Sequence, residues 1–480
     1  MNYRMVFYLI GKIMLVCGAV LTLPLIVSWI YSEPTAVAFL ITIGVFLLVG
    51  GICAFKRPAK KEMFAREGLL IVAVSWILFS LIGALPFYIS GEIPSYIDCF
   101  FETVSGFTTT GSTILKNVEE LSRSMLFWRS FTHWIGGMGI LVFAMTILSQ
   151  ADTKTSHIMR AEMPGPKVGK LVSKWKFTVR ILYSIYFVLS ALEVVLLLCG
   201  GMPLFDSIVH TFGTAGTGGF GIKNSSIAYY NSAYIDYVIG IFMILFGMNF
   251  NVFYFLLIRR FVQAFKNEEI LCYLGVIAVA VGCIAWNIRG LYGTFAEAFR
   301  FSFFQVSSII TTTGYATADF TAWPVFSQGI LVLLMFIGGC AGSTAGGLKV
   351  IRITILWKTA ARMVKKTLNP RSVVSVKNDG KMIEQNVVSG VGGYFIVYML
   401  IFAASVLVVC LNGKDMVTSV TAVAATLNNV GPGLGTVGPN GNFADFSLLS
   451  KLVMSFDMLA GRLELFPILM LFSPGTWKKS

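Results

Sequence analysis

Long apolar runs separated by short basic stretches recur along the whole chain of 480 residues. A helix needs about 20 predominantly apolar residues to cross the hydrocarbon core of a bilayer. Ten runs of roughly that length carry few or no charges, and each predicts a membrane-spanning helix. They are Ile13–Ser32, Pro34–Phe55, Gly68–Gly91, Ser130–Ala151, Ile181–Gly201, Tyr237–Ile258, Ile270–Ile288, Pro324–Leu348, Asn386–Asn412 and Phe446–Phe472.

Short, weakly apolar segments follow the third, fifth, seventh and ninth of these runs. They are Ser95–Thr108, Pro203–Thr214, Thr294–Ile310 and Asp415–Leu427. Each is too short to cross a bilayer, and its length is typical of a re-entrant helix. Carboxylates near their ends either attract cations electrostatically or cap the helices. We expect capping for Asp98, Asp206 and Asp415, while Glu193 in the fifth run is expected at a buried interface.

A glycine-rich stretch with threonine or asparagine follows each short segment. When Gly111, Gly219, Gly314 and Gly431 are aligned, they are separated by 108, 95 and 117 positions. This spacing predicts an all-α integral membrane protein with four pseudo-fourfold repeats of helix, re-entrant helix, irregular strand and helix. Two extra helices precede the repeats. The expected boundaries are 1–67 for the extra helices, then 68–151, 152–266, 267–368 and 369–480 for the repeats.

The four glycine-rich stretches predict a cation pore. Irregular backbone at membrane depth is tolerated only where it is buried in protein or lines water. Four such strands around one axis present rings of carbonyl oxygens, which replace the hydration shell of a cation. One stretch alone is typical of an ordinary turn between helices, whereas four at equivalent places favour a pore. The candidate filter residues are Thr109, Thr110, Gly111, Ser112, Thr217, Gly218, Gly219, Phe220, Thr312, Thr313, Gly314, Tyr315, Asn429, Val430, Gly431 and Pro432.

Composition and charge exclude several classes of protein. Hydrophobic residues make up 56% of the chain and charged residues 12%, about half the share that is usual in soluble domains. The net charge of +14 is explained by topology, because 28 of the 37 Lys and Arg residues fall on one side if ten spans alternate. The positive-inside rule then places both termini in the cytoplasm, and no nucleic-acid partner is expected. The eight cysteines lie in apolar runs, and the three histidines are too dispersed for a metal site.

Four motifs point to a known family. They occupy residues 160–166 (Arg-Ala-Glu-Met-Pro-Gly-Pro), 338–349, 428–435 and 461–467. With them, the whole chain resembles the Trk/Ktr/HKT superfamily of potassium transporters, and its two extra N-terminal helices resemble the TrkH/TrkG type. The resemblance implies K⁺ as substrate and a bacterial cytoplasmic (inner) membrane location. It also implies K⁺ preference over Na⁺, because all four aligned positions carry glycine.

A break is expected inside the eighth run. Apolar, helix-compatible sequence continues there to Leu368, which is too long for one span. The break consists of Gly338, Gly339, Gly342, Ser343, Thr344, Gly346, Gly347 and their neighbours up to Lys349. Small residues also permit a close helix crossing, but the resemblance implies a gate loop beneath the filter. Lys349 at its edge is expected to contact the pore or a partner.

Arg462 lies inside the last predicted span, where a charge is costly and indicates function. The resemblance implies a position near the pore beneath the filter. The structural alternative is a pair with Asp457 or Glu464.

No nucleotide-binding motif and no large soluble segment occur, so no cofactor and no enzymatic activity are expected in this chain. The resemblance implies a homodimer and a cytosolic TrkA-type ring that binds ATP/ADP or NAD(H). The basic inner loops fit such a ring or anionic membrane lipid. The leading hypothesis is gated K⁺ uptake through the filter. The alternative is a secondary symporter that couples K⁺ to H⁺ or Na⁺.

Overall fold

The computed structural model describes residues 2–56, 58, 65–139, 175–372 and 374–477. The described part is mostly helical, as expected. It also contains a small hairpin of β1 (Lys377–Asn378) and β2 (Lys381–Met382). The motif at 160–166 and most of the basic loop around it lie outside the described residues.

Six helical stretches in the described part are long and apolar enough to cross a membrane. They agree with the first, second, third, fifth, seventh and ninth predicted spans, although the first begins at Tyr3, ten residues before its predicted start. They consist of α1 (Tyr3–Val20) with α2 (Thr22–Ile30), α3 (Ala36–Ala54), α4 (Ala65–Gly83) with α5 (Leu85–Ser90), α10 (Trp175–Cys199), α15 (Glu268–Ile288) and α19 (Gln385–Cys410).

The helices that follow the glycine-rich stretches are shorter than predicted. They are α7 (Arg123–Gly137), α12 (Ala233–Gly247), α17 (Val325–Ile337) and α21 (Leu448–Arg462). The break predicted after α17 is confirmed, because α18 (Val350–Leu368) begins only after Lys349. The sixth and tenth spans were wrongly predicted as continuous helices. Between α12 and α13 (Phe250–Leu257) the chain bends by 94°, and α21 is separated from α22 (Phe466–Phe472). The second half of the fourth span lies outside the described residues.

Tight backbone contacts occur at the ends of two of these helices. A Cβ atom at Gly136 would lie 1.9 Å from the carbonyl oxygen of Phe107, and one at Gly461 would lie 2.0 Å from that of Leu427. Only glycine permits an approach this close. The contacts hold the ends of α7 and α21 directly against the short helices described next.

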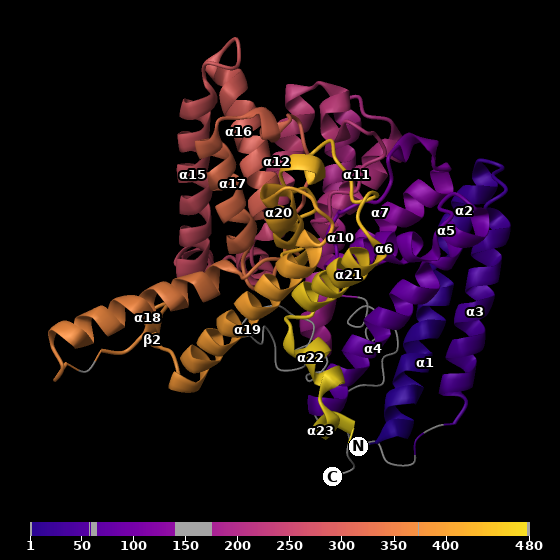
Figure 1. Cartoon of the computed structure of the whole chain (residues 1–480), viewed down its shortest axis with the longest axis horizontal. Coiled ribbons are helices and arrows are strands. Elements are labelled where there is room, and N and C mark those ends of the chain that lie inside the picture. The colour runs from indigo at the N-terminus through magenta and orange to yellow at the C-terminus, as the bar shows by residue number, and fades with distance from the viewer. Residues whose placement is uncertain (1, 57, 59–64, 140–174, 373, 478–480) are drawn as a thin grey trace.

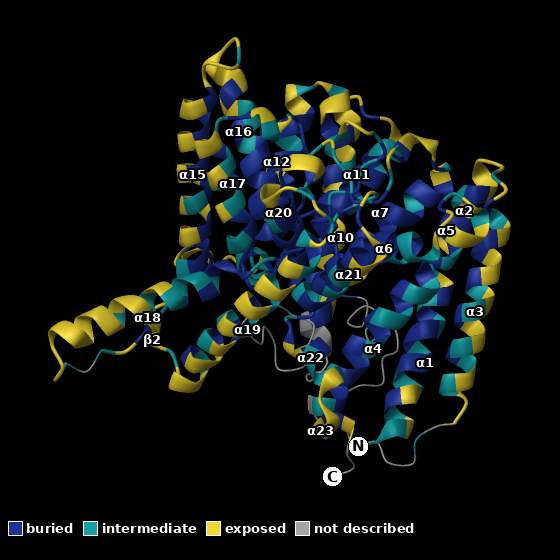
Figure 2. Ribbon diagram, in the orientation of Figure 1, coloured by how far each residue is buried: buried dark blue, intermediate teal, exposed yellow. Residues whose placement is uncertain are grey.

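The four predicted short helices are confirmed and form the buried centre of the bundle (Figure 2). They are α6 (Tyr96–Phe107), α11 (Leu204–Gly216), α16 (Phe295–Ile310) and α20 (Met416–Leu427). Asp415 caps α20, since its carboxylate accepts the Thr418 amide at 2.9 Å. Thr418 also holds the pKa of the Asp415 carboxyl below its usual value.

Capping was wrongly predicted for Asp98 and Asp206. Residues just before α6 and α11, Ser95 and Pro203, occupy the cap positions there. Asp98 instead forms an ion pair with Lys451 at 2.6 Å. Asp206 accepts a hydrogen bond from the Tyr230 hydroxyl at 2.7 Å. Both carboxylates therefore join neighbouring elements rather than terminate a helix.

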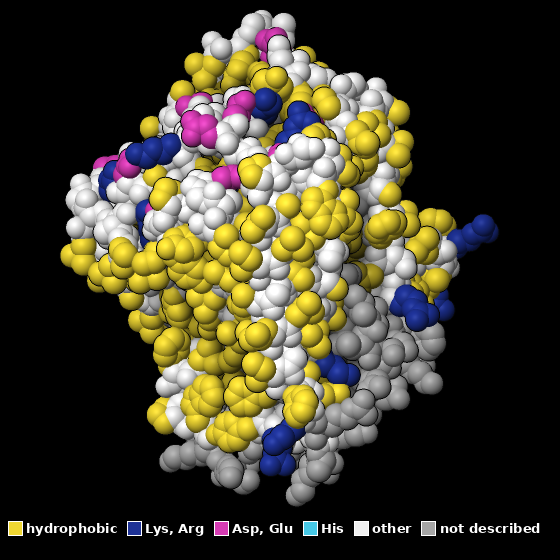
Figure 3. Space-filling view, turned by 90° about the vertical axis from the view of Figure 1, so that its right-hand side faces the viewer, with side chains coloured by type: hydrophobic (Ala, Val, Ile, Leu, Met, Phe, Trp, Pro, Cys, Tyr) yellow, Lys and Arg dark blue, Asp and Glu magenta, His cyan; other side chains and the backbone are white. Residues whose placement is uncertain are grey.

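The arrangement of the bundle fits a membrane. Both termini lie at the same end, and α18 extends sideways from the half of the bundle that holds them (Figure 1). One side of the molecule carries a broad band of hydrophobic side chains, with Asp and Glu visible only above the band and Lys and Arg above and below it (Figure 3). Side chains such as Leu48, Ile52 and Val279 are more than 60% exposed, and such faces are stable when they contact lipid.

The remaining elements are short connections. They are η1 (Val118–Glu120), η2 (Ser226–Tyr230), η3 (Phe320–Ala322) and η4 (Gly435–Val437), which are 3₁₀ turns, with α14 (Phe261–Phe265) and α23 (Pro474–Trp477).

Candidate functional site

The four short helices end in the same way. In each, one residue adopts a left-handed backbone with φ between 54° and 57°; these residues are Thr109, Thr217, Thr312 and Asn429. The next amide bonds to the carbonyl five residues earlier, as in a Schellman cap. These bonds are Thr110 to Ser105 at 2.9 Å, and Gly218 to Gly213, Thr313 to Ser308 and Val430 to Ala425 at 2.8 Å. One local geometry therefore starts all four predicted filter segments.

We number these segments in chain order: segment 1 is 109–112, segment 2 is 217–220, segment 3 is 312–315 and segment 4 is 429–432. The aligned glycine of each has a positive φ, between 75° and 99°. All sixteen predicted filter residues lie in these segments, and none is exposed.

The glycines join the segments into a closed ring. A Cβ atom on Gly111 would lie 2.1 Å from the carbonyl oxygen of Gly218 in segment 2. The same relation continues from segment 2 to 3, from 3 to 4 and from 4 back to 1. A Cβ on Gly219 would lie 1.9 Å from the carbonyl oxygen of Thr313, and one on Gly314 would lie 2.3 Å from that of Val430. A Cβ on Gly431 would lie 2.8 Å from the carbonyl oxygen of Thr110. Space and backbone angle both require glycine at these positions.

Side chains reinforce the joint between segments 4 and 1. The Asn429 amide donates to the Thr110 hydroxyl at 2.9 Å, and the Ser112 hydroxyl donates to the Gly431 carbonyl at 3.1 Å. The joint between segments 2 and 3 uses Tyr315, whose hydroxyl donates to the Phe220 carbonyl at 3.2 Å. The ring is thus held together by close backbone packing and by side-chain hydrogen bonds.

Histidines that the sequence left without a role support the ring from behind. His210 lies 3.3 Å from the Tyr315 hydroxyl and 3.1 Å from that of Tyr230. The His133 Nδ1 atom lies 2.7 Å from the Gly106 carbonyl, so Nδ1 carries the proton of this contact. A Cβ on Gly218 would meet the His133 ring at 2.4 Å. Nothing in their sequence spacing indicates these contacts, which depend on how α7 and α11 pack.

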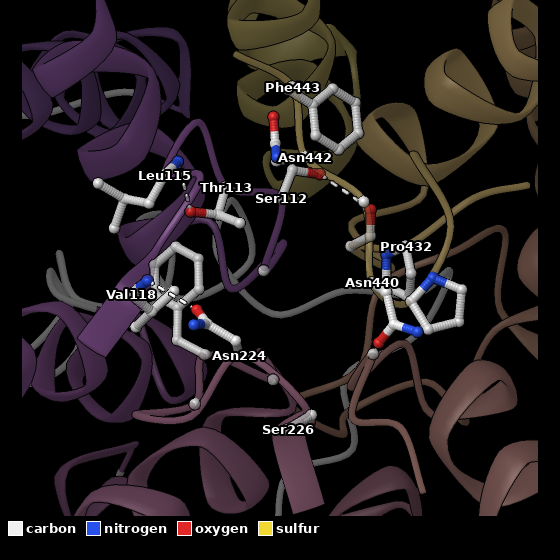
Figure 4. Close-up of a pocket in the computed structure, with 18 of the residues that line it drawn as sticks. Ser112, Thr113, Leu115, Val118, Asn224, Ser226, Pro432, Asn440, Asn442 and Phe443 are labelled. Carbon is white, nitrogen blue, oxygen red and sulfur yellow. Dashed lines mark hydrogen bonds between the residues drawn. The ribbon is translucent and has the colours of Figure 1, made fainter. Parts of the chain in front are cut away.

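A cavity of about 110 Å³ opens on one side of the ring. All four aligned glycines line it, together with loop residues such as Asn224, Asn440 and Asn442 (Figure 4). We call this cavity the mouth.

The cations around the mouth are paired with acids. Lys116 contacts Asp445 at 3.0 Å, and Lys223 contacts Glu119 at 3.0 Å. The Lys223 ammonium holds the pKa of the Glu119 carboxyl below its usual value, and Glu119 raises the pKa of Lys223. Pairing of this kind leaves less positive charge to repel an approaching cation.

The predicted gate loop lies against the start of segments 3 and 4. The Gly346 amide donates to the Thr312 hydroxyl at 2.6 Å, and the Gly347 amide donates to the Asn428 carbonyl at 3.0 Å. A Cβ on Gly346 would lie 2.3 Å from that same carbonyl oxygen. Gly338, Gly342, Gly347 and Lys349 all have positive φ angles, so the loop is a sharply folded backbone.

The other face of the loop is bound to the break between α12 and α13. The Cys340 amide donates to the Gly247 carbonyl at 2.9 Å, and the Phe250 amide donates to the Gly342 carbonyl at 3.1 Å. Lys349 is only 2% exposed, and its ammonium group donates to the Ala345 carbonyl inside the loop. Lys349 is therefore placed to hold the loop itself.

Arg462 joins the loop to α7. Its guanidinium donates to the Thr344 carbonyl at 2.6 Å, and to the Gly136 and Gly137 carbonyls at 2.5 and 2.8 Å. The carboxylates suggested as its alternative partners are engaged elsewhere, since Glu464 pairs with Arg352 and Asp457 accepts from Ser405 at 2.8 Å.

The chain is similar to known proteins over its full length. The family model of TrkH, a cation transport protein, matches residues 35–279 and 293–479. The chain is 37% identical to the Trk system potassium uptake protein TrkH of Salmonella typhimurium, with 100% of both chains covered. It is 34% identical to the Trk system potassium uptake protein TrkG of Escherichia coli, with 99% of both covered.

The fold is also similar to that of a solved structure. The crystal structure of the potassium transporter TrkH from Vibrio parahaemolyticus matches with a TM-score of 0.90 at 34% identity, and 100% of each chain is covered. The family model alone spans well over half of the chain. This chain therefore belongs to the TrkH family of cation transport proteins.

Proposed function

We propose that this chain is the membrane subunit of a K⁺ uptake system and that K⁺ crosses through the ring formed by segments 1 to 4. The observation that carries the proposal is the closed cycle of four glycines, each against the carbonyl of the next segment. The names of the full-length relatives, which are potassium uptake proteins, support K⁺ as the substrate.

The chemistry of the ring suits a dehydrated cation. Backbone carbonyls supply ligands in place of water. The short helices end next to the ring, and the negative ends of their dipoles stabilise a cation there. The mouth would receive the hydrated ion on the other side.

The residues with left-handed backbone at the start of the four segments provide a second ring of candidate ligands. A β-branched residue with positive φ costs about 1–3 kcal/mol, and Thr109, Thr217 and Thr312 all adopt this geometry. Glycine would remove the strain, so the hydroxyl groups have a use that offsets it. The Thr109 hydroxyl and the Asn429 amide oxygen are buried and have no partner in the described part of the chain, as expected of ligands for a passing ion.

We propose that the gate loop closes this path. Its Gly346 amide occupies the Thr312 hydroxyl, which is one member of the second ring. Withdrawal of the loop would free that hydroxyl. A cytosolic TrkA-type nucleotide-binding ring is the expected regulator and would carry any ATP/ADP or NAD(H). Helix α18, which follows the loop directly, gives a mechanical connection to such a partner.

The wider architecture follows from the same proposal. We place four repeats, at 68–151, 152–266, 267–368 and 369–480, around one axis in a ten-span protein of the bacterial inner membrane. Both termini are placed in the cytoplasm, and two chains form a homodimer in which each keeps its own pore. The shared backbone geometry of the four segments supports the repeat assignment.

Flux into proteoliposomes tests the function. K⁺ and Na⁺ gradients are imposed separately, with and without a pH gradient. We expect K⁺ to move down its own gradient independently of Na⁺ and H⁺. Obligatory coupling of K⁺ movement to either ion would favour the symporter instead.

A further inference from the structure

A buried ion pair lies beside the ring. The Arg129 Nε atom of α7 contacts a Glu102 carboxylate oxygen of α6 at 2.6 Å. The two side chains are 3% and 0% exposed. Burying two charges is costly even when they are paired, and apolar residues of similar size often pack equally well. A pair kept in this position therefore needs a reason beyond stability.

The remaining hydrogen bonds of Glu102 go to the chain that leaves segment 1. Its carboxylate accepts from the Thr113 hydroxyl at 2.9 and 3.1 Å and from the Ile114 amide at 3.0 Å. Thr113 follows segment 1 directly. Glu102 thus fixes the exit of segment 1 to the short helix that precedes it.

Arg129 also contacts the last residue of segment 2, Phe220, and the residue that follows it, Gly221. Its Nη1 group donates to the Gly221 carbonyl at 2.9 Å. The centre of its guanidinium group lies 3.5 Å from the centre of the Phe220 ring, a cation–π distance. Arg129 also lines the mouth. The ion pair is therefore the joint between two filter segments that lie 108 positions apart in the chain.

We infer that Glu102 and Arg129 form a clamp that fixes the spacing between segments 1 and 2 and so determines how well the ring distinguishes K⁺ from Na⁺. The inference rests on the proposed function. The clamp acts through hydrogen bonds to both segments, and its internal neutrality keeps the Arg129 charge from repelling cations at the mouth. Both residues are positioning residues, since neither is among the candidate ion ligands.

Three variants separate the effect of the spacing between segments 1 and 2 from the effect of an unpaired charge at the mouth. They are Glu102→Gln, Arg129→Gln and the double variant. The readouts are the ratio of K⁺ to Na⁺ flux in proteoliposomes and the absolute K⁺ flux. We expect all three variants to lower the ratio by about tenfold, which corresponds to about 1.4 kcal/mol between the two ions. The double variant is decisive, because it restores neutrality without restoring the ion pair or the guanidinium contacts with Gly221 and Phe220. A wild-type ratio in the double variant would overturn the spacing clamp.

Asp98→Asn is the matched control. Asp98 lies one turn before Glu102 on α6 and pairs with Lys451 of α21, and neither residue is among those that line the mouth. We expect this variant to keep the wild-type ratio. An equal loss of selectivity on breaking this pair would show that any ion pair on α6 suffices, and would also overturn the clamp.

Folding is followed by gel filtration and thermal unfolding of each variant. If the glutamine variants do not fold, Arg129→Lys replaces them, because lysine keeps the charge but lacks the planar fork that reaches Glu102 and Gly221 together. We expect it to reduce selectivity while K⁺ flux remains, and an unchanged ratio in the folded lysine variant would contradict the clamp. Wild-type protein without K⁺ flux would overturn the proposed function, whereas a K⁺-selective wild type with unaltered variants would overturn only the clamp.

Discussion

At the scale of single residues, the site is defined by backbone angles that most side chains avoid. Three threonines and one asparagine take the left-handed conformation at equivalent places, each two residues before a glycine that also has a positive φ. Asparagine adopts this conformation readily, whereas for the β-branched threonine it is strained. The strain is therefore concentrated at residues whose side chains carry oxygen.

Replacing Thr109 tests whether its hydroxyl group is used. Thr109→Val keeps the shape and the β-branch but removes the oxygen, so we expect K⁺ flux to fall several-fold while the protein stays folded. Thr109→Ser retains the oxygen and should keep most of the flux. K⁺ flux is measured in proteoliposomes. A valine variant with the flux of wild type would contradict the role of the Thr109 hydroxyl as a K⁺ ligand.

Glu119 predicts a pH dependence at the mouth. Its pKa is lowered by Lys223, so the stabilisation from this pair is fully present above the usual pKa of a glutamate. It is lost as the pH falls through the lowered value. We expect the difference in unfolding temperature between wild type and Glu119→Gln to shrink on acidification. A difference that stays constant down to strongly acidic pH would exclude this coupling.

The sequence predicts the residues of the four segments but not the contacts that support them. Glycine at four aligned positions is visible along the chain, because its conformational role is local. The contacts of Glu102 with Arg129, and of Tyr315 with Phe220, join residues 27 and 95 positions apart. Such contacts depend on packing between helices. The pairing of Glu102 with Arg129 therefore has no counterpart in the sequence pattern.

At the scale of elements, all four helices that follow the segments end after 13 to 15 residues. The sequence predicted only the break after α17, where glycines are dense. Hydropathy measures the length of an apolar run but not its direction, so the 94° bend after α12 and the interruption after α21 were missed. The short helices were predicted well, because each weakly apolar segment is clearly shorter than a membrane-spanning run.

Arg462 connects two of these helix ends to the gate loop. Arg462→Ala removes three hydrogen bonds to the carbonyls of Thr344, Gly136 and Gly137. We expect the loop to loosen and K⁺ flux to rise several-fold in proteoliposomes. Arg462→Lys keeps the positive charge but lacks the forked guanidinium group. An equal rise of K⁺ flux in this variant would assign the effect to the lost hydrogen bonds and not to the charge. A folded alanine variant with wild-type flux would contradict a role in gating.

At the scale of the whole molecule, the charge and the shape together predict an orientation. The termini share one end of the bundle, and the connection between α15 and α16 lies at the other (Figure 1). The positive-inside rule assigns the end with the termini to the cytoplasm.

Cysteine labelling tests this orientation. Leu291→Cys, in the connection between α15 and α16, and Asn369→Cys, at the end of α18, both replace exposed residues. In a cysteine-free background, we expect a membrane-impermeant thiol reagent to label the first in intact cells. The second should react only after the membrane is opened. The reverse pattern would contradict the proposed topology.

We propose that the closed ring of glycines selects K⁺, and glycine substitutions in the ring test this selectivity. K⁺ and Na⁺ fluxes are compared in proteoliposomes of wild type, Gly219→Ser and Gly275→Ser. A Cβ at Gly219 would lie 1.9 Å from the Thr313 carbonyl oxygen, whereas one at Gly275 on α15 has nothing within 4 Å. We expect strong K⁺ preference in wild type and Gly275→Ser, and a clear loss of this preference in Gly219→Ser. Wild-type selectivity in a folded Gly219→Ser variant would contradict this proposal.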